Sequence, residues 1–122
     1  MSIGDDKENT VSAKAMVLEF GMGVDVHGED CTKAACRAVS DAIRHSSLPI
    51  LQEIRERGGT MFVDVTVAVP DPASVDLEVV KAELPHGEVS VQAVSGGLRV
   101  PGSETLIACA AITVSAQYPA TS

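Results

Sequence analysis

The stretch VSAKAMVLEFGMGVDVHGEDCTKAACRAVSDAI, residues 11–43, predicts a strand, a polar loop and a helix in succession. Side chains alternate in character over residues 11–20, as in a strand, which we expect to break at Gly21-Met22-Gly23. A helix is expected from about Asp30, and the carboxylate of either Asp30 or Glu29 can accept hydrogen bonds from N–H groups of the first turn. Apolar residues then recur at spacings of three and four and predict one buried stripe. The stripe consists of Cys31, Ala35, Ala38, Val39, Ala42 and Ile43.

The remaining chain predicts two further helices and three further strands. Residues 60–69 are the clearest strand, because five apolar side chains at alternate positions face one way while Asp64 and Thr66 face the other. We expect a second helix from Leu48 to Gly58-Gly59, a short helix within residues 73–84, and strands at 88–94 and 105–117. The inner side of the short helix is expected to be Val75, Val79, Val80 and Leu84. This order predicts an α+β fold, with a four-stranded mixed sheet that carries two to three helices on one face.

Length and composition predict one domain that associates with copies of itself. The 122 residues suffice for one core, at residues 11–118, between a disordered acidic tail (1–10) and a short tail (119–122). The chain has no Trp, one Tyr and two Phe, so the core must be built from small side chains. The sheet face without helices has no cover left in a chain of this length. We therefore expect a homo-oligomer formed through that face or through the sheet edges.

The charge excludes some classes of partner. Seventeen acidic against nine basic residues give a formal net charge of −8, which opposes binding to nucleic acid or to anionic membrane surfaces. No apolar run approaches the roughly 20 residues of a membrane span, and the acidic first ten residues are unlike a secretory signal. Three cysteines without metal-type spacing are typical of reduced thiols in a cytoplasmic protein.

The loop between Gly21 and Lys33 concentrates polar chemistry. In an extended backbone Asp25, His27 and Glu29 project to one side, where they can hold a divalent metal or a general base with its orienting carboxylate. The alternative is structural: the carboxylates cap the following helix and His27 bonds locally. The glycines lack the third glycine of a dinucleotide loop and the lysine of a phosphate loop, so neither is predicted.

A second candidate is Ser95-Gly96-Gly97, at the end of a strand. The serine can act as a nucleophile and the glycine N–H groups can stabilise an oxyanion, although the same tripeptide also marks a plain turn. Lys33 and Arg37, one helical turn apart, form either an anion clamp or ion pairs with nearby acids. Candidate bases for the serine are His27, Lys33 and His86.

The run GMGVDVHGEDCTKAACRAVSDAIRHSSLP resembles the signature of a widespread family of short, functionally uncharacterised bacterial proteins. More distantly, the strand running into Ser95-Gly96-Gly97 and the glycine-bearing strand before an Ala-rich helix are similar to single domains of the cyanuric acid hydrolase and barbiturase family. Those enzymes open cyclic amide rings with serine–lysine pairs at the centre of three similar domains. The resemblance implies a homotrimer with sites between subunits. This chain has Val24 and Asp25 where that family places a lysine.

Two hypotheses follow, and the sequence leaves open whether the protein is an enzyme. In the first, the protein hydrolyses a small polar substrate resembling a cyclic amide at a subunit interface. His27 is then the base, Asp25 its orienting group and Ser95 the nucleophile or a substrate contact. The further substrate-binding residues are Gly96, Gly97, Lys33 and Arg37. In the second, the protein is a non-catalytic binding or assembly module, in which Asp25, His27 and Glu29 bind a divalent metal or another ligand.

Overall fold

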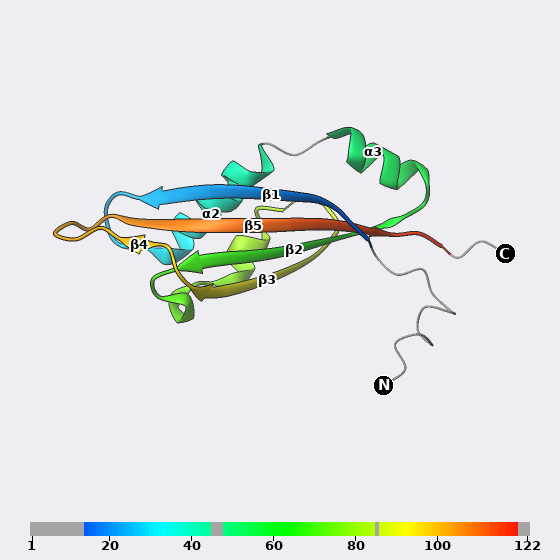
Figure 1. Cartoon of the computed structure of the whole chain (residues 1–122). Coiled ribbons are helices and arrows are strands. Elements are labelled where there is room, and N and C mark those ends of the chain that lie inside the picture. The colour runs from blue at the N-terminus through cyan, green and yellow to red at the C-terminus, as the bar shows by residue number, and fades with distance from the viewer. Residues whose placement is uncertain (1–13, 45–47, 85, 120–122) are drawn as a thin grey trace.

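The computed structural model describes residues 14–44, 48–84 and 86–119 as one α+β layer structure (Figure 1). The predicted tails fall outside these residues except for Pro119. In chain order the elements are β1 (Lys14–Asp25), α2 (Cys31–Ile43), α3 (Leu48–Glu56), β2 (Thr60–Val69), the 3-10 helix η1 (Pro72–Ser74), α4 (Leu77–Lys81), β3 (Glu88–Ser95), β4 (Leu98–Arg99) and β5 (Leu106–Gln117).

The strands form one mixed sheet in the order β1-β5-β2-β3, with the two-residue β4 paired to β5. Strand β5 runs antiparallel to both β1 and β2, and β2 runs parallel to β3. Strands β1, β2 and β3 therefore point the same way, and their carboxyl ends meet at one end of the sheet. The α+β prediction is confirmed, with five strands instead of four because β4 adds a short strand beside β5.

The prediction that the first strand breaks at Gly21 is wrong, since β1 continues to Asp25. Gly21 pairs with Ala110 of β5 and Gly23 pairs with Ala108. A β-carbon on Gly21 would lie 2.1 Å from the carbonyl oxygen of Ala38 in α2. The glycines thus continue the strand and let the backbone of α2 lie directly on that of β1, an approach that any side chain would prevent.

Helix α2 contributes small side chains to this contact. Ala34, Ala38 and Ala42 recur every four residues and are fully buried. Facing them are valines of β2 and small residues of β5, which confirms that the core lacks large aromatic groups. Phe20, one of the two phenylalanines, lies outside the core with 64% of its surface exposed.

The short helix predicted for residues 73–84 is divided in two. Pro72 opens η1, and α4 starts after Asp76, whose side chain accepts from the N–H groups of Glu78 and Val79. Val80 is fully buried, whereas Val79 is exposed, so its predicted inward position is wrong. The five-residue α4 presents only a narrow inner side to the sheet.

Helices α2 and α4 lie behind the sheet in Figure 1, α3 lies where β2 begins, and no described element covers the front. On that side large apolar side chains are exposed over neighbouring strands, with smaller ones between them. We call this surface the open face. It consists of Leu18, Phe20, Met22, Ala68, Val94, Leu98, Ile107, Cys109 and Ala111.

Candidate functional site

The polar turn, residues 25–30, links the end of β1 to the start of α2. Gly28 and Glu29 both have left-handed backbone conformations, with φ of 99° and 51°. The side chain of Asp30 then caps α2 by accepting from the N–H of Lys33 at 3.1 Å. Two consecutive left-handed residues stop the alternation of side chains that a strand imposes.

Asp25 is the buried centre of this turn, with 2% of its surface exposed. Its Oδ2 accepts from the N–H of Asp30 at 2.8 Å. Its Oδ1 lies 3.9 Å from Lys33 Nζ and 3.7 Å from Arg37 Nη1. A buried carboxylate is costly unless it is hydrogen-bonded and paired, and both conditions are met here. Asp25 therefore ties the end of β1 to the first turns of α2.

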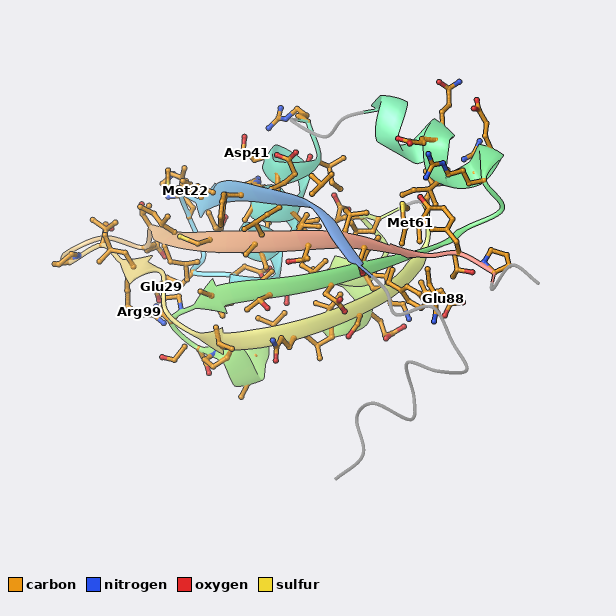
Figure 2. All side chains as sticks on the ribbon, turned by 45° about the vertical axis from the view of Figure 1, so that its right-hand side comes forward. Met22, Glu29, Asp41, Met61, Glu88 and Arg99 are labelled. Carbon is orange, nitrogen blue, oxygen red and sulfur yellow. The ribbon has the colours of Figure 1, made fainter. Side chains whose placement is uncertain are left out.

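The helix also protects the outer edge of β1. Asp41 Oδ2 accepts from the N–H of Met22 at 3.0 Å, and Arg37 Nη1 donates to the carbonyl oxygen of Val24 at 2.6 Å. These main-chain groups point away from β5 and would otherwise offer themselves to another strand. Figure 2 shows Asp41 above Met22 on the ribbon.

His27 and Glu29 face a different part of the chain, the loop from β4 to β5. Arg99 Nη1 lies 2.8 Å from Glu29 Oε1, and the two side chains lie side by side in Figure 2. His27 Nδ1 lies 3.9 Å from Glu104 Oε2, with 86% of the His27 side chain exposed. The Thr105 hydroxyl donates to the carbonyl oxygen of Val26 at 2.9 Å. These contacts fasten the polar turn to the loop before β5.

The expectation that Asp25, His27 and Glu29 project to one side is therefore wrong. Asp25 faces α2, while His27 and Glu29 point toward Glu104 and Arg99. Within the described part of the chain, no three His, Cys, Asp or Glu side chains gather closely enough to hold a metal ion. Of the two alternatives for Lys33 and Arg37, the structure shows ion pairs with a nearby acid, which is Asp25.

Ser95-Gly96-Gly97 lies at the same end of the sheet as the polar turn but at the opposite edge of the sheet. Ser95 ends β3, three strand spacings from β1, or about 14 Å at the usual spacing between strands. The N–H of Gly96 donates to the carbonyl oxygen of Val69 at 2.9 Å, so that group is occupied. A β-carbon on Gly97 would lie 2.2 Å from the carbonyl oxygen of Ile107. The two glycines thus carry the chain closely past β2 toward β5, and one chain does not bring Ser95 to His27.

The thiols differ in their surroundings. Cys31 is buried at the start of α2, and Cys109 is exposed on the open face. Burial raises the pKa of the Cys36 thiol, and the nearby carboxylates of Glu83, Asp30 and Asp76 raise it further. Cys36 is thus a structural thiol with a weak contact to the carbonyl oxygen of Val79 at 3.9 Å.

The residues that sequence reasoning missed are Arg99, Glu104 and Thr105. They flank a Pro-Gly turn far along the chain, and only the insertion of β5 beside β1 brings them to the polar turn. The role of Gly21 and Gly23 was also missed, because nothing in the strand itself shows that the backbone of α2 packs against these two positions.

Fold and site together define a small α+β protein whose first helix lies on a glycine-bearing strand and is held there by a buried aspartate. Among the described residues, no helix is long and apolar enough to cross a membrane. The chain belongs to the family described as conserved hypothetical protein (Lin0512_fam), whose model matches residues 15–114.

A solved structure is similar to this chain in both sequence and fold. The chain is similar to an FtsZ-like protein of unknown function from Nostoc punctiforme PCC 73102, known from a crystal structure, with 39% sequence identity and a TM-score of 0.76. The match covers 86% of this chain and 97% of that one. No curated protein matches the chain.

Proposed function

We propose that this protein is a self-associating module, in which copies of the chain join through the open face. The observation that supports the proposal most directly is that three large apolar side chains of β1 are left exposed by the described residues. Leu18 is 55% exposed, Phe20 is 64% exposed and Met22 is 57% exposed, all on the same side of the sheet. Contiguous apolar surface of this kind is rare on monomeric proteins and marks contact with a partner.

The charge of the surface favours a second copy as that partner. The nine residues of the open face are uncharged, although the chain carries a net charge of −8; Asp64 on β2 and Glu88 on β3 share this side of the sheet but lie earlier on those strands than Ala68 and Val94. Two copies that meet through acidic surface repel each other, whereas the open face can be buried against the open faces of other copies without desolvating a charge. The capped edge at Met22 and Val24 directs contact to the face of the sheet and away from its β1 edge.

Association would also bear on the polar turn. The hydrolase hypothesis requires Ser95 near His27, and the topology of one chain keeps the two apart. A second copy can supply its own Ser95 at that place. That hypothesis, with its cyclic-amide substrate, stays a prediction because the described contacts of one chain do not assemble a nucleophile and a base. The same holds for a divalent metal at Asp25, His27 and Glu29. Three copies are the expected number, following the resemblance to three-domain hydrolases.

Native mass spectrometry tests the proposal by counting subunits. We expect a homo-oligomer for the unmodified chain and a monomer for Phe20→Ser, which removes the most exposed side chain of the open face. The matched control is Val79→Ser, because Val79 is also exposed but lies on α4, on the helix side of the sheet. A monomeric unmodified chain at micromolar concentration would overturn the proposal. Two copies in place of three would correct only the number.

Thiol labelling locates the interface. Cys109 lies within the open face, opposite Met22 on β1 and Ala68 on β2. In the oligomer we expect iodoacetamide to modify Cys109 slowly, and in Phe20→Ser rapidly. Equal rates in an oligomeric unmodified chain and a monomeric Phe20→Ser variant would place the interface elsewhere.

A further inference from the structure

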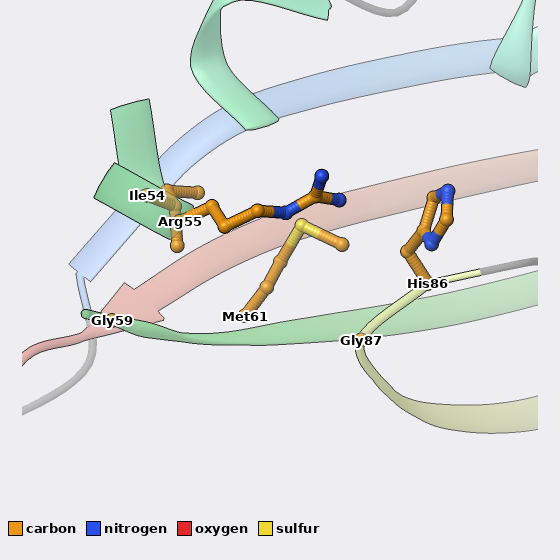
Figure 3. Close-up of a pocket in the computed structure, with 6 residues that line it drawn as sticks. All are labelled: Ile54, Arg55, Gly59, Met61, His86 and Gly87. Carbon is orange, nitrogen blue, oxygen red and sulfur yellow. The ribbon is translucent and has the colours of Figure 1, made fainter. Parts of the chain in front are cut away.

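A second feature of the molecule lies at the opposite end of the sheet from the polar turn. There the end of α3, the start of β2 and the start of β3 line an open pocket of about 240 Å³ (Figure 3). Its lining residues are Ile54, Arg55, Gly59, Met61, His86 and Gly87. All six come from one chain, so the pocket exists whether or not copies associate.

The pocket contains two exposed polar donors, Arg55 and His86, for which the described residues supply no partner. Each of the other arginines, namely Arg37, Arg44, Arg57 and Arg99, pairs with a carboxylate. Arg55 forms no such pair with any described residue, and no hydrogen bond of the His86 side chain is found among them either. In a chain with a net charge of −8, Arg55 is thus the one arginine for which the described residues supply no carboxylate.

Met61 and Ile54 supply the apolar part of the pocket lining, beside the backbone of Gly59 and Gly87. Figure 3 shows the Arg55 side chain extending across Met61 in the direction of His86. A β-carbon on Gly87 would lie 2.9 Å from Met61 Cε, and one on Gly59 would lie 3.2 Å from Ile54 Cγ2. Because both positions are glycine, backbone atoms line this part of the pocket, and the flexible Met61 side chain lines the part between them.

We propose that this pocket binds a small carboxylate with a flat apolar body. A guanidinium presents two parallel N–H donors that match a carboxylate, and the imidazole of His86 adds a donor from the facing wall. The Met61 side chain can contact a flat apolar group, and a bare inorganic anion would not make that contact. At about 240 Å³ the pocket is smaller than the roughly 300–1,000 Å³ typical for drug-sized ligands, so the occupant is small.

Benzoate is a suitable probe, because it combines a carboxylate with a flat ring. Titration of the full chain, followed by NMR of the methionine methyl groups, should give a saturable shift of Met61 while Met22 on the open face stays unchanged. Benzamide has the same shape without the charge, and inorganic phosphate has charge without the ring. Both should bind at least about tenfold more weakly, as expected when a charge-assisted hydrogen bond or the apolar contact is lost.

Two variants test the assignment of the donor. Arg55→Gln should weaken benzoate binding about tenfold or more, whereas Arg57→Gln should leave it unchanged. Arg57 is the matched control because it lies on the same segment but pairs with Glu53 and stacks over Tyr118. The proposal is overturned if benzoate produces no saturable Met61 shift, if benzamide binds equally well, or if Arg55→Gln binds as the unmodified chain does. Phosphate binding more tightly than benzoate would assign the pocket to inorganic anions.

Discussion

Gly23 of β1 lies directly against Ala34 of α2, so closely that a β-carbon on Gly23 would come within 2.2 Å of the Ala34 carbonyl oxygen. The neighbouring amide of Ala38 would be 2.3 Å away. Both contacts are with backbone, which cannot move aside as the end of a side chain can. The position of the first helix on the sheet therefore depends on the absence of a single methyl group.

Gly23→Ala should destabilise the fold by about 3 kcal/mol, at the upper end of the range for overpacked cores. Gly58→Ala is the comparison, because Gly58 has a positive φ of 70° but nothing within 4 Å of its β-carbon position. Gly58→Ala should lower the free energy of unfolding by only about 1 kcal/mol, the cost of a left-handed backbone at alanine. Urea unfolding followed by circular dichroism measures both. Equal losses would show that α2 moves away at little cost.

Asp25→Asn should lower the free energy of unfolding by about 1.5 kcal/mol. The amide oxygen can still accept from the N–H of Asp30, but the charge that faces Lys33 and Arg37 is gone. The two cations are about half exposed, so solvent screens their share of the loss. Asp64→Asn, on an exposed carboxylate of β2, should change stability little. Unchanged stability of Asp25→Asn in urea would contradict a role for the charge.

Cys36 should react with iodoacetamide more slowly than the same cysteine in the urea-unfolded chain. Its pKa is raised in the fold by burial and then by three carboxylates, so less thiolate is present at pH 8. Peptide mass spectrometry after timed alkylation gives the rate at each cysteine. A folded rate equal to the unfolded one would show that the raised pKa has no kinetic consequence.

The same shift predicts a direction for stability with pH. Below the ordinary thiol pKa of about 8.5, Cys36 is protonated in both the folded and the unfolded chain. As pH rises above that value, the unfolded chain loses the proton that the folded chain keeps, so stability falls. Cys36→Ala should therefore show a smaller loss of stability between pH 8 and pH 10 than the unmodified chain. Parallel pH profiles for the two proteins would contradict the prediction.

Glu29 and Arg99 should show a small coupling energy of about 0.5 kcal/mol in a double-mutant cycle, because both side chains are partly exposed. The cycle uses Glu29→Gln and Arg99→Gln, alone and together, with unfolding free energy as the measurement. The pair Glu53 and Arg57, at helical spacing, provides a reference for a surface ion pair. A coupling at or below zero would mean that the ion pair does not fasten the polar turn.

The fold class could be read from local patterns because periodicity reports which side of an element is buried. Residues 60–69 alternate so clearly that their strand was predicted with the bounds that β2 has. The short helix was less accurate, since Pro72 and Asp76 divide it in ways that hydrophobic spacing does not encode. The glycines of β1 look like an interruption of the strand, because a close contact between two backbones leaves no pattern in the neighbouring sequence.

The candidate site was harder to predict because it depends on partners distant in sequence. The polar groups of residues 25–30 are evident in the sequence, and so is the alternative that a carboxylate caps the helix, which is what Asp30 does while Asp25 accepts from the N–H of Asp30. Thr105 and Val26, by contrast, are brought together across 79 positions of sequence. Arg55 and His86 come from a helix end and a turn that have no pattern in common.

The position of β5 has a consequence for how the protein is made. This last strand lies between β1 and β2, and among the described strands it is the one that joins β1 to the rest of the sheet. During synthesis on the ribosome, the sheet lacks β5 at first. The unit of β1 with α2 and the unit of β2 with β3 then remain separate, with the strand edges that will pair with β5 still unpaired. The sheet closes only when residues 106–117 have emerged, so folding is a late event that long-range pairing makes slow. A nascent chain stalled before Leu106 would thus be a natural client for a chaperone.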